Sequence, residues 1–303
     1  MNLLVTGAFD LDEEKLNTLK QLNHNVVFMQ QEKDPLPCKP EWVEGIIGNG
    51  IFLSHKIEDF TSLRYIQLTS AGFDRVPMDY VKEHKINIFN ARGVYSAPMA
   101  EFALTGVLNL YKNCAFFAEN QKEHKWEKKR DLKELSGKNV CIIGCGSVGN
   151  ECAKRFKAFD CYVAGVDIKP YKSEFYNTML SLENINNSLK NADIIVLTLP
   201  LTKQTKHLIN SERFKFIKKD AVLVNIARGA VIDTAALLTA LKRGDIGGAV
   251  LDTFEEEPLK TKSPLWDFKN VIITPHNSFV GLGNTNRLWN LILENLKKSE
   301  KQH

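Results

Sequence analysis

The feature that most constrains this chain is a glycine-rich turn, GCGSVG at residues 144–149, which is followed by an acidic residue, Asp167. An apolar run at 140–143 precedes the turn and a helix-like segment at 150–159 follows it. A second apolar run at 161–166 then ends at the acid. Strand, tight turn, helix, strand and carboxylate in this order are the layout of a dinucleotide-binding βαβ unit. The segment therefore predicts a Rossmann-like domain.

Each glycine of the turn has its own task in such a unit. Gly144 allows the tight turn, Gly146 lets the backbone approach a pyrophosphate, and Gly149 lets the helix pack on the strand. The N–H groups at the helix N-terminus favour phosphate. Asp167 follows at roughly the 20-residue spacing at which an acid binds the ribose hydroxyls of NAD. Because its charge would repel a 2′-phosphate, the sequence favours NAD over NADP, although Lys169 two residues on is a feature that NADP could use.

Composition and charge exclude several other classes of protein. The 303 residues carry 40 basic and 36 acidic side chains, a net charge of +4, which does not suggest nucleic acid or an anionic membrane as a partner. No apolar run approaches the ~20 residues of a membrane span. The six cysteines form no metal-binding spacing, and Cys145 only fills the variable position of the turn. Together with an N-terminus that lacks the pattern of a signal peptide, these features predict a cytoplasmic protein without a metal.

Near-continuous Ile, Val and Leu runs alternate with helical patterns along the whole chain. Such runs are typical of parallel strands covered on both faces. The pattern predicts strands at 2–5, 25–28, 43–47, 65–68, 86–89, 140–143, 161–166, 193–199, 221–226, 248–251 and 271–273. It predicts helices at 12–22, 77–83, 97–119, 150–159, 211–217, 234–242 and 284–298. The fold class that follows is α/β, with two Rossmann-like domains built on doubly wound parallel sheets.

The domain order follows from the position of the glycine-rich unit, which comes after a first βα series is nearly complete. We expect a flavodoxin-like substrate domain over 1–97, completed by a returning last helix at 282–303. An NAD-binding Rossmann domain would occupy 98–281. Ligand sites are common between domains, so the active site is expected in the interdomain cleft.

Three polar residues follow predicted strands of the second domain. Arg228 comes just after the strand at 221–226, Glu257 follows the strand at 248–251, and His276 follows the strand at 271–273. Carboxyl ends of strands are where doubly wound sheets bind ligands. Each residue taken singly is more simply a surface or turn residue. Three of them at the strand ends of one nucleotide-binding domain favour a catalytic site.

The three side chains suit the reduction of a keto acid beside a nicotinamide. Arginine can hold a carboxylate with two parallel hydrogen bonds and polarise the neighbouring carbonyl. Histidine can give a proton to the carbonyl oxygen as hydride arrives at carbon, and take it back in reverse. A carboxylate beside the imidazole fixes its orientation and favours its charged form.

At these residues the chain resembles the D-isomer-specific 2-hydroxyacid dehydrogenase family. The motifs that carry the resemblance are GCGSVG with Asp167, NIARG at 225–229, DTFEEEP at 252–258 and TPH at 274–276. Further matches are SAGFD at 70–74, Asn90, MAEF at 99–102 and LPLT at 199–202. The resemblance runs from about Tyr65 to the last helix.

The resemblance implies a role for each matching residue. His276 is the acid/base, Glu257 its partner and Arg228 the substrate clamp. N–H groups of Ala71 and Gly72 help to bind the substrate carboxylate. The remaining implied roles concern the cofactor: Ser147 and Val148 at the pyrophosphate, Asp167 at the ribose, and Leu199, Pro200, Ile226, Ala227 and Asp252 around the nicotinamide, whose carboxamide Asp252 meets. Domain closure would exclude water.

The resemblance also implies a homodimer through the cofactor domain, with the predicted helix at 97–119 as the candidate interface. The substrate is a small 2-keto or 2-hydroxy acid whose side chain the sequence does not identify. A phosphorylated substrate would need further cations, for which Arg75, Arg92 and Arg287 are available, although surface or structural pairing is the simpler expectation for each.

Other activities of the same fold stay open to different degrees. An NAD-sensing module that binds protein partners without catalysis is the main alternative. Such relatives carry extended tails, whereas only a few polar residues follow the last predicted helix here. Formate oxidation is disfavoured because Glu257 stands where a glutamine is expected. A short, unregulated phosphoglycerate or hydroxypyruvate enzyme remains possible, but the length excludes one with a regulatory domain.

Overall fold

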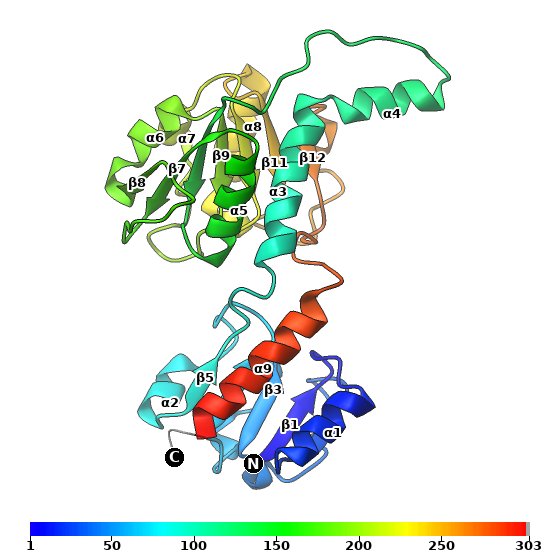
Figure 1. Cartoon of the computed structure of the whole chain (residues 1–303), viewed down its shortest axis with the longest axis vertical. Coiled ribbons are helices and arrows are strands. Elements are labelled where there is room, and N and C mark those ends of the chain that lie inside the picture. Colours follow the sequence, from blue (N-terminus) through cyan, green and yellow to red (C-terminus); the bar gives the residue numbers. More distant parts are fainter. Residues whose placement is uncertain (301–303) are drawn as a thin grey trace. The chain divides into compact units, whose positions relative to one another are not determined.

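The computed structural model describes residues 1–300, and the side chains of residues 1–299. The chain folds into two compact units (Figure 1). Unit 1 comprises Met1–Tyr95 and the chain from Gly281 onward, and unit 2 comprises Ser96–Val280. The divisions fall after Tyr95 and Val280, where the sequence led us to expect 97 and 281. Among the described residues, no helix is both long and apolar enough to span a bilayer.

Unit 1 is built on a five-stranded parallel sheet in the order β2-β1-β3-β4-β5. Its strands are β1 Asn2–Thr6, β2 Asn25–Met29, β3 Gly45–Gly48, β4 Tyr65–Leu68 and β5 Asn87–Phe89. Its α-helices are α1 Glu13–Gln21, α2 Met78–Glu83 and α9 Asn284–Glu300. Short 3₁₀ turns, η1 Pro40–Trp42, η2 Ile51–Leu53 and η3 Ile57–Asp59, complete the connections.

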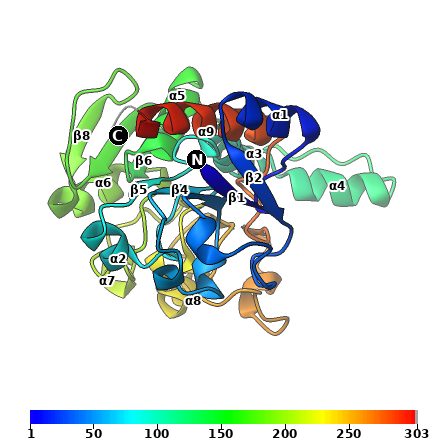
Figure 2. The same ribbon diagram turned by 90° about the horizontal axis from the view of Figure 1, so that it is seen from below.

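Helices cover both faces of this sheet, as a doubly wound fold requires. On one face, Leu19 of α1 and Leu288, Ile292 and Leu296 of α9 pack against strand residues such as Leu3. Figure 2 shows α1 and α9 side by side on this face, and α2 on the other. The apolar positions of α9 recur at helical spacing, which places them on one side. The last helix of the chain therefore belongs to the core of the first unit.

Unit 2 contains a seven-stranded parallel sheet in the order β12-β11-β10-β9-β6-β7-β8. Its strands are β6 Asn139–Ile143, β7 Tyr162–Asp167, β8 Thr178–Ser181, β9 Ile194–Leu197, β10 Val222–Asn225, β11 Gly248–Leu251 and β12 Val271–Ile273. Its α-helices are α3 Ser96–Tyr111, α4 Cys114–Lys122, α5 Ser147–Ala158, α6 Ile185–Asn191, α7 Ser211–Phe214 and α8 Thr234–Arg243. Its 3₁₀ turns are η4 Leu182–Asn184, η5 Gly229–Val231 and η6 Pro264–Asp267. The predicted α/β class with doubly wound parallel sheets is confirmed.

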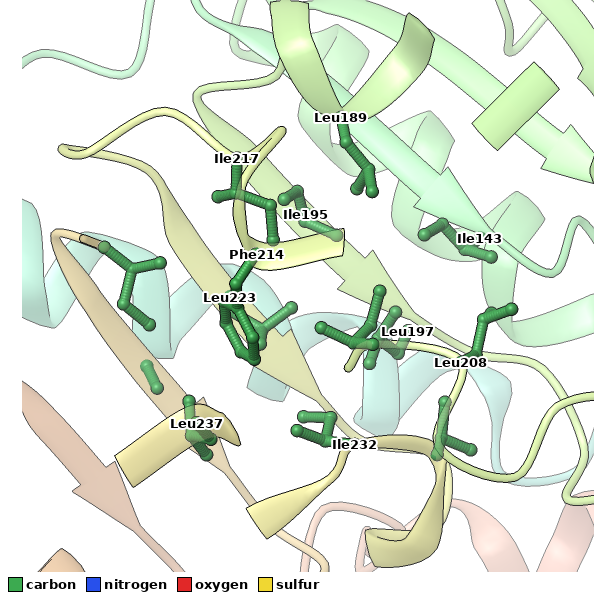
Figure 3. Packing of buried hydrophobic residues seen from close by; sticks show 14 of the residues in the cluster. Ile143, Leu189, Ile195, Leu197, Leu208, Phe214, Ile217, Leu223, Ile232 and Leu237 are labelled. Atoms are coloured by element: carbon green, nitrogen blue, oxygen red, sulfur yellow. The ribbon is translucent and has the colours of Figure 1, made fainter. Parts of the chain in front are cut away.

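Two hydrophobic clusters lie on the two faces of this sheet. One joins α3 and α5 to the strands. The other joins α6, α7 and α8 to the opposite face, and Figure 3 shows its helix and loop side chains meeting those of the strands. These labelled side chains are Leu189, Leu208, Phe214, Ile217, Ile232 and Leu237 from the helices and loops, and Ile143, Ile195, Leu197 and Leu223 from the strands. The strand order reverses between β6 and β9, which is the point where such sheets bind ligands.

In unit 2, one predicted helix was wrong and two elements were not predicted. The single helix expected at 97–119 is two helices, because Asn113 adopts a left-handed backbone (φ 49°) that ends the first and starts the second. Strand β8 was not predicted, since it is a half-buried edge strand without a run of Ile, Val or Leu. Helix α6 was not predicted either, because its sequence INNSLKN is mostly polar.

Candidate active site

The three glycines of the turn have three different surroundings. Gly144 has φ +98°, and a Cβ there would lie 2.7 Å from the backbone of Leu199. A Cβ on Gly149 would lie 2.2 Å from the carbonyl oxygen of Gly144. A Cβ on Gly146 would meet nothing within 4 Å. The first and third glycines are thus explained by the fold, whereas the open space at Gly146 is what a closely approaching ligand needs.

The turn leads directly into α5, whose N-cap is Gly146. Gly146 has no side chain that could cap the helix, so the first turn of α5 can serve a bound phosphate. Ser147 and Val148 are the first residues of the helix and are half-buried. Cys145 is buried, which raises the pKa of its thiol to about 12. The thiol stays protonated near neutral pH and packs as a small apolar group.

Asp167 ends β7 and lies beside the turn. Its Oδ2 accepts a hydrogen bond from the backbone N–H of Cys145 at 2.7 Å, and its Oδ1 accepts one from the backbone N–H of Lys169 at 3.1 Å. A carboxylate oxygen can accept two hydrogen bonds, so each keeps capacity for a ribose hydroxyl. Tyr171, which the sequence did not single out, also reaches the turn. Its hydroxyl lies 2.6 Å from the carbonyl oxygen of Cys145 and 2.7 Å from Asn150 Oδ1.

The residues predicted around the nicotinamide are mostly buried. Leu199 follows β9 and backs the turn at Gly144, while Pro200 is exposed. Ile226 and Ala227, just past β10, are 1% and 7% exposed and belong to the two cores of unit 2. Their side chains pack in the core at this edge of the sheet and do not point out into solvent.

Asn225 shapes the turn that carries Arg228. Its Oδ1 accepts a hydrogen bond from the N–H of Ala227 at 3.1 Å, and its Nδ2 donates to the carbonyl oxygen of Arg228 at 3.0 Å. The guanidinium of Arg228 is exposed and donates to the carbonyl oxygen of Ala227 at 2.8 Å. Within residues 1–299 no carboxylate pairs with it. Its charge is therefore available to an anionic ligand.

Asp252 holds the loop that carries His276. This carboxylate accepts hydrogen bonds from Thr274 Oγ1 and the Asn277 N–H, both at 2.7 Å, and from the Ser278 N–H at 2.9 Å. Its side chain has no exposed surface. The predicted contact with a nicotinamide carboxamide would therefore need the loop to move, and Asp252 serves the folding of the loop. Sequence reasoning missed this role, although an acid directly after a buried strand was visible.

His276 and Glu257 are brought together. His276 Nδ1 lies 2.9 Å from Glu257 Oε2, and both side chains are a little over one-third exposed. Glu257 Oε1 also accepts the Phe254 N–H at 3.0 Å. The backbone of His276 has φ +52° and donates its N–H to the Asp252 carbonyl oxygen at 2.8 Å. With Nδ1 against a carboxylate, the ring presents Nε2 as its second polar atom.

Ala71 and Gly72 lie in unit 1, on the loop that follows β4. Asn90 Nδ2 donates to the Ala71 carbonyl oxygen at 2.7 Å, which fixes the loop. In the part of the chain that the structure describes, neither the Ala71 nor the Gly72 N–H has a hydrogen-bond partner. Among the described residues, no three His, Cys, Asp or Glu side chains gather as a metal site.

The cations considered for a phosphorylated substrate also lie in unit 1. Arg287 is held by the fold, because its Nε donates to the Val94 carbonyl oxygen and its Nη2 to Asn284 Oδ1, both at 2.7 Å. Arg92 and Arg287 line a hollow of about 240 Å³ together with Asn290 and Glu294. Glu294 adds a negative charge to its wall, so the hollow is not an evident phosphate site.

Comparison with known proteins identifies the family. Residues 104–278 match the family model described as D-isomer specific 2-hydroxyacid dehydrogenase, NAD binding domain. The chain is 31% identical over 300 residues to glyoxylate reductase of Thermofilum pendens, and the match covers 94% of this chain and 88% of the relative.

Two solved structures match the fold along nearly the whole chain. A D-isomer specific 2-hydroxyacid dehydrogenase from Xanthobacter autotrophicus, in complex with NADPH and MES, is 28% identical with a TM-score of 0.81, covering 100% of this chain and 95% of that one. D-lactate dehydrogenase from Aquifex aeolicus, complexed with NAD and lactic acid, is 26% identical with a TM-score of 0.79, covering 99% and 96%. The chain belongs to the D-isomer specific 2-hydroxyacid dehydrogenase family, and its class of activity is that of an oxidoreductase.

Proposed function

We propose that the protein interconverts a small 2-keto acid and its D-2-hydroxy acid by hydride transfer, with His276 as the acid/base. The observation that carries the proposal is the 2.9 Å contact between His276 Nδ1 and Glu257 Oε2. This contact holds the proton on Nδ1 and leaves Nε2 for the substrate oxygen. A bound nicotinamide would supply the hydride to the carbonyl carbon, or accept it in reverse.

The chain's own residues then move one proton and hold one anion. During reduction, His276 Nε2 donates its proton to the carbonyl oxygen, and the Glu257 carboxylate stabilises the charged ring before this transfer. Arg228 is the proposed clamp for the substrate carboxylate, because its guanidinium is exposed and has no carboxylate partner within residues 1–299. The N–H groups of Ala71 and Gly72 are the proposed further donors to that carboxylate.

The residues of unit 2 fit a dinucleotide. The space at Gly146, the uncapped start of α5 and the Asp167 carboxylate beside the turn match a pyrophosphate followed by a ribose. One matched structure contains NAD and another contains NADPH. We propose NAD for this chain, because the Asp167 carboxylate would repel a 2′-phosphate. Ser147 and Val148 are the proposed pyrophosphate contacts.

The proposed substrate has a small side chain without a phosphate. The T. pendens relative is a glyoxylate reductase, which acts on a very small keto acid by its name. Arg287 already donates to Val94 and Asn284, which leaves fewer of its N–H groups for a phosphate. Two broader expectations also remain proposals: a cytoplasmic location, on the six free cysteines, and a homodimer formed through unit 2.

The first test is NADH consumption with a panel of keto acids, followed by absorbance, with NADPH in parallel. The panel comprises glyoxylate, pyruvate, hydroxypyruvate, phosphohydroxypyruvate and a branched-chain keto acid. Turnover of a small member with NADH supports the proposal, and preference for phosphohydroxypyruvate would overturn its substrate part. Tight NADH binding without any turnover would favour an NAD-sensing binding protein.

A His276→Gln variant tests the acid/base assignment. General acid–base catalysis contributes about 10²- to 10⁴-fold, so we expect kcat to fall by about that factor. Binding of NADH, measured by its fluorescence, should not change. His84→Gln is the matched control, because His84 is an exposed histidine at the end of α2. Near-normal turnover of His276→Gln would contradict the assignment.

A further inference from the structure

A second imidazole–carboxylate contact lies beside the first one. His207 Nε2 is 3.0 Å from Glu255 Oε2, and the other oxygen of Glu255 accepts the N–H of Thr234 at 2.8 Å. Glu255 stands two residues before Glu257 in the chain. Sequence reasoning gave neither His207 nor Glu255 a role, and nothing in the proposed proton transfer uses them.

The Thr234 N–H is a donor that α8 leaves unpaired. The N-cap of this helix, Asp233, accepts hydrogen bonds from Ala235 and Ala236 but not from Thr234. The first N–H groups of a helix have no partner within the helix, and a carboxylate there is favoured by the helix dipole. Glu255 therefore anchors its own segment to the start of α8.

The backbone of His207 is also held in place. Its N–H donates to the Ala230 carbonyl oxygen at 2.8 Å, and Ile209 forms a parallel bridge with Ile232. The segment that carries His207 thus runs along the segment between Arg228 and α8. Glu255 consequently joins three segments through one carboxylate: its own, that of His207 and the start of α8.

The backbone of Glu255 also touches the turn of Arg228. A Cβ on Gly229 would lie 1.8 Å from the carbonyl carbon of Phe254 and 2.3 Å from the nitrogen of Glu255. The backbone N–H of Phe254, the residue before Glu255, donates to Glu257 Oε1 at 3.0 Å. The turn formed by residues 254–257 is therefore packed on the Arg228 loop and closed on Glu257.

We propose that Glu255 is a positioning residue, whose bonds with Thr234 and His207 hold the 254–257 turn so that Glu257 meets His276. The proposal rests on the proposed acid/base function of that pair. Burial by itself would raise the pKa of Glu255, but the hydrogen bonds from Thr234 and His207 outweigh it and hold the pKa below its usual value. Glu255 is a carboxylate at neutral pH and can accept both bonds.

The test compares Glu255→Ala, Glu257→Ala and the double variant in keto-acid reduction. The readout is kcat/KM across pH, with NADH affinity measured in parallel. If Glu255 acts through Glu257, Glu255→Ala lowers kcat/KM roughly tenfold or more and moves the alkaline limb of the profile to lower pH. In the Glu257→Ala background the same change has little further effect, because the contact it supports is already gone. NADH affinity stays constant throughout.

The chain offers a matched control in the neighbouring residue. Glu256 is exposed and pairs with Lys260 at 2.7 Å, away from Thr234 and His207, so Glu256→Ala should leave the profile unchanged. Glu255→Gln, whose amide oxygen can still accept the Thr234 N–H although its NH₂ group cannot accept from His207, should restore part of the activity. If Glu255→Ala does not fold, His207→Ala removes one of the two anchors and should shift the same limb by a smaller amount.

The outcomes separate this proposal from the function on which it rests. If Glu257→Ala shifts the profile while Glu255→Ala and His207→Ala do not, the positioning role is overturned and the acid/base pair stands. Additive losses in the double variant overturn it as well, because they place the effect of Glu255 elsewhere. If Glu257→Ala leaves the profile unchanged, the proposed acid/base pair itself fails.

Discussion

At the scale of single residues, the glycine-rich turn separates the needs of the fold from those of a ligand. Gly144 and Gly149 each face backbone atoms that leave no room for a side chain, whereas Gly146 faces open space. The sequence motif predicted a separate task for each of the three glycines, with Gly146 as the one that a pyrophosphate approaches. The atoms around each glycine in the structure show which of the three can be replaced without disturbing the fold.

The variant Gly146→Ala should lose cofactor binding and keep its stability. Gly146 has an extended backbone, φ −80° and ψ −157°, which alanine can adopt. We expect the free energy of unfolding to change by less than about 0.5 kcal/mol. The dissociation constant of NADH should rise about tenfold or more, equal to about 1.4 kcal/mol, since the new methyl group occupies the proposed path of the pyrophosphate. Fluorescence titration and thermal unfolding measure the two quantities.

The companion variant Gly149→Ala should behave in the opposite way. Alanine gains about 1 kcal/mol of helix propensity over glycine. Its Cβ would however lie 2.2 Å from the Gly144 carbonyl oxygen, a backbone atom that no side-chain rotation can move. We expect a net loss of about 1–3 kcal/mol in stability. Equal loss of NADH affinity at unchanged stability in both variants would contradict this division of roles.

At the scale of elements, apolar runs located the central strands well and polar segments poorly. The predicted strand at 248–251 coincides with β11, and the one predicted at 140–143 lies within β6. Strand β8 and helix α6 escaped because edge and surface elements bury less apolar surface and show no clear period. The break between α3 and α4 depends on one backbone angle at Asn113, which the surrounding helical pattern hides.

The candidate site shows the same limit. Motifs at strand ends were enough to select Arg228, Glu257 and His276 as candidates, and the structure brings Glu257 and His276 together. The partners of Asp252 and Glu255 depend on which loops come together in space, and the sequence does not show which groups these are. In the sequence alone, these two carboxylates cannot be distinguished from those of ordinary exposed loop residues.

One supporting contact of this kind, at Asp193, should contribute to the acid sensitivity of unit 2. Its carboxylate accepts hydrogen bonds from Lys218 Nζ and the Asn139 N–H, both at 2.8 Å, at the start of β9. Burial raises the pKa of Asp193, but these bonds and Lys218 outweigh it and lower the pKa below its ordinary value. The stabilisation is therefore present above the pKa of the unfolded state, about 3.9, and is lost as pH falls through the folded-state value.

The variant Asp193→Asn should accordingly destabilise unit 2 by about 1.5–3 kcal/mol at pH 7, the range for hydrogen bonds to charged groups. The difference from the unmodified protein should shrink steadily as the pH is lowered below about 4. Urea unfolding at several pH values measures it. Glu212→Gln is the control, since Glu212 and Lys215 form an exposed pair that should contribute at most about 1 kcal/mol. A pH-independent loss would show that charge is not the cause.

At the scale of the whole molecule, the proposed dimer needs a surface on unit 2 that remains uncovered in one chain. Helix α3 buries Ala100, Ala103 and Val107 in the core of unit 2, so only its remaining face could belong to that surface. Helix α4 and the irregular segment after it extend from the body of this unit (Figure 1). Trp126 on that segment is 96% exposed, and Phe117 of α4 is 38% exposed. Large aromatic side chains so exposed are typical of an interaction surface.

A second copy of the chain is the partner that we propose for this arm, which predicts that the protein is a dimer and that the arm holds it together. Replacing Phe117 and Trp126 with serine should therefore yield a monomer at micromolar concentration, measured by sedimentation. Trp266→Ser is the matched control, because Trp266 is 51% exposed in the same unit but lies on η6. Its variant should remain a dimer.

Since the core of unit 2 is formed without the arm, the monomer should still bind NADH. A double variant that stays dimeric would place the interface elsewhere, and a monomeric unmodified protein would contradict the dimer itself.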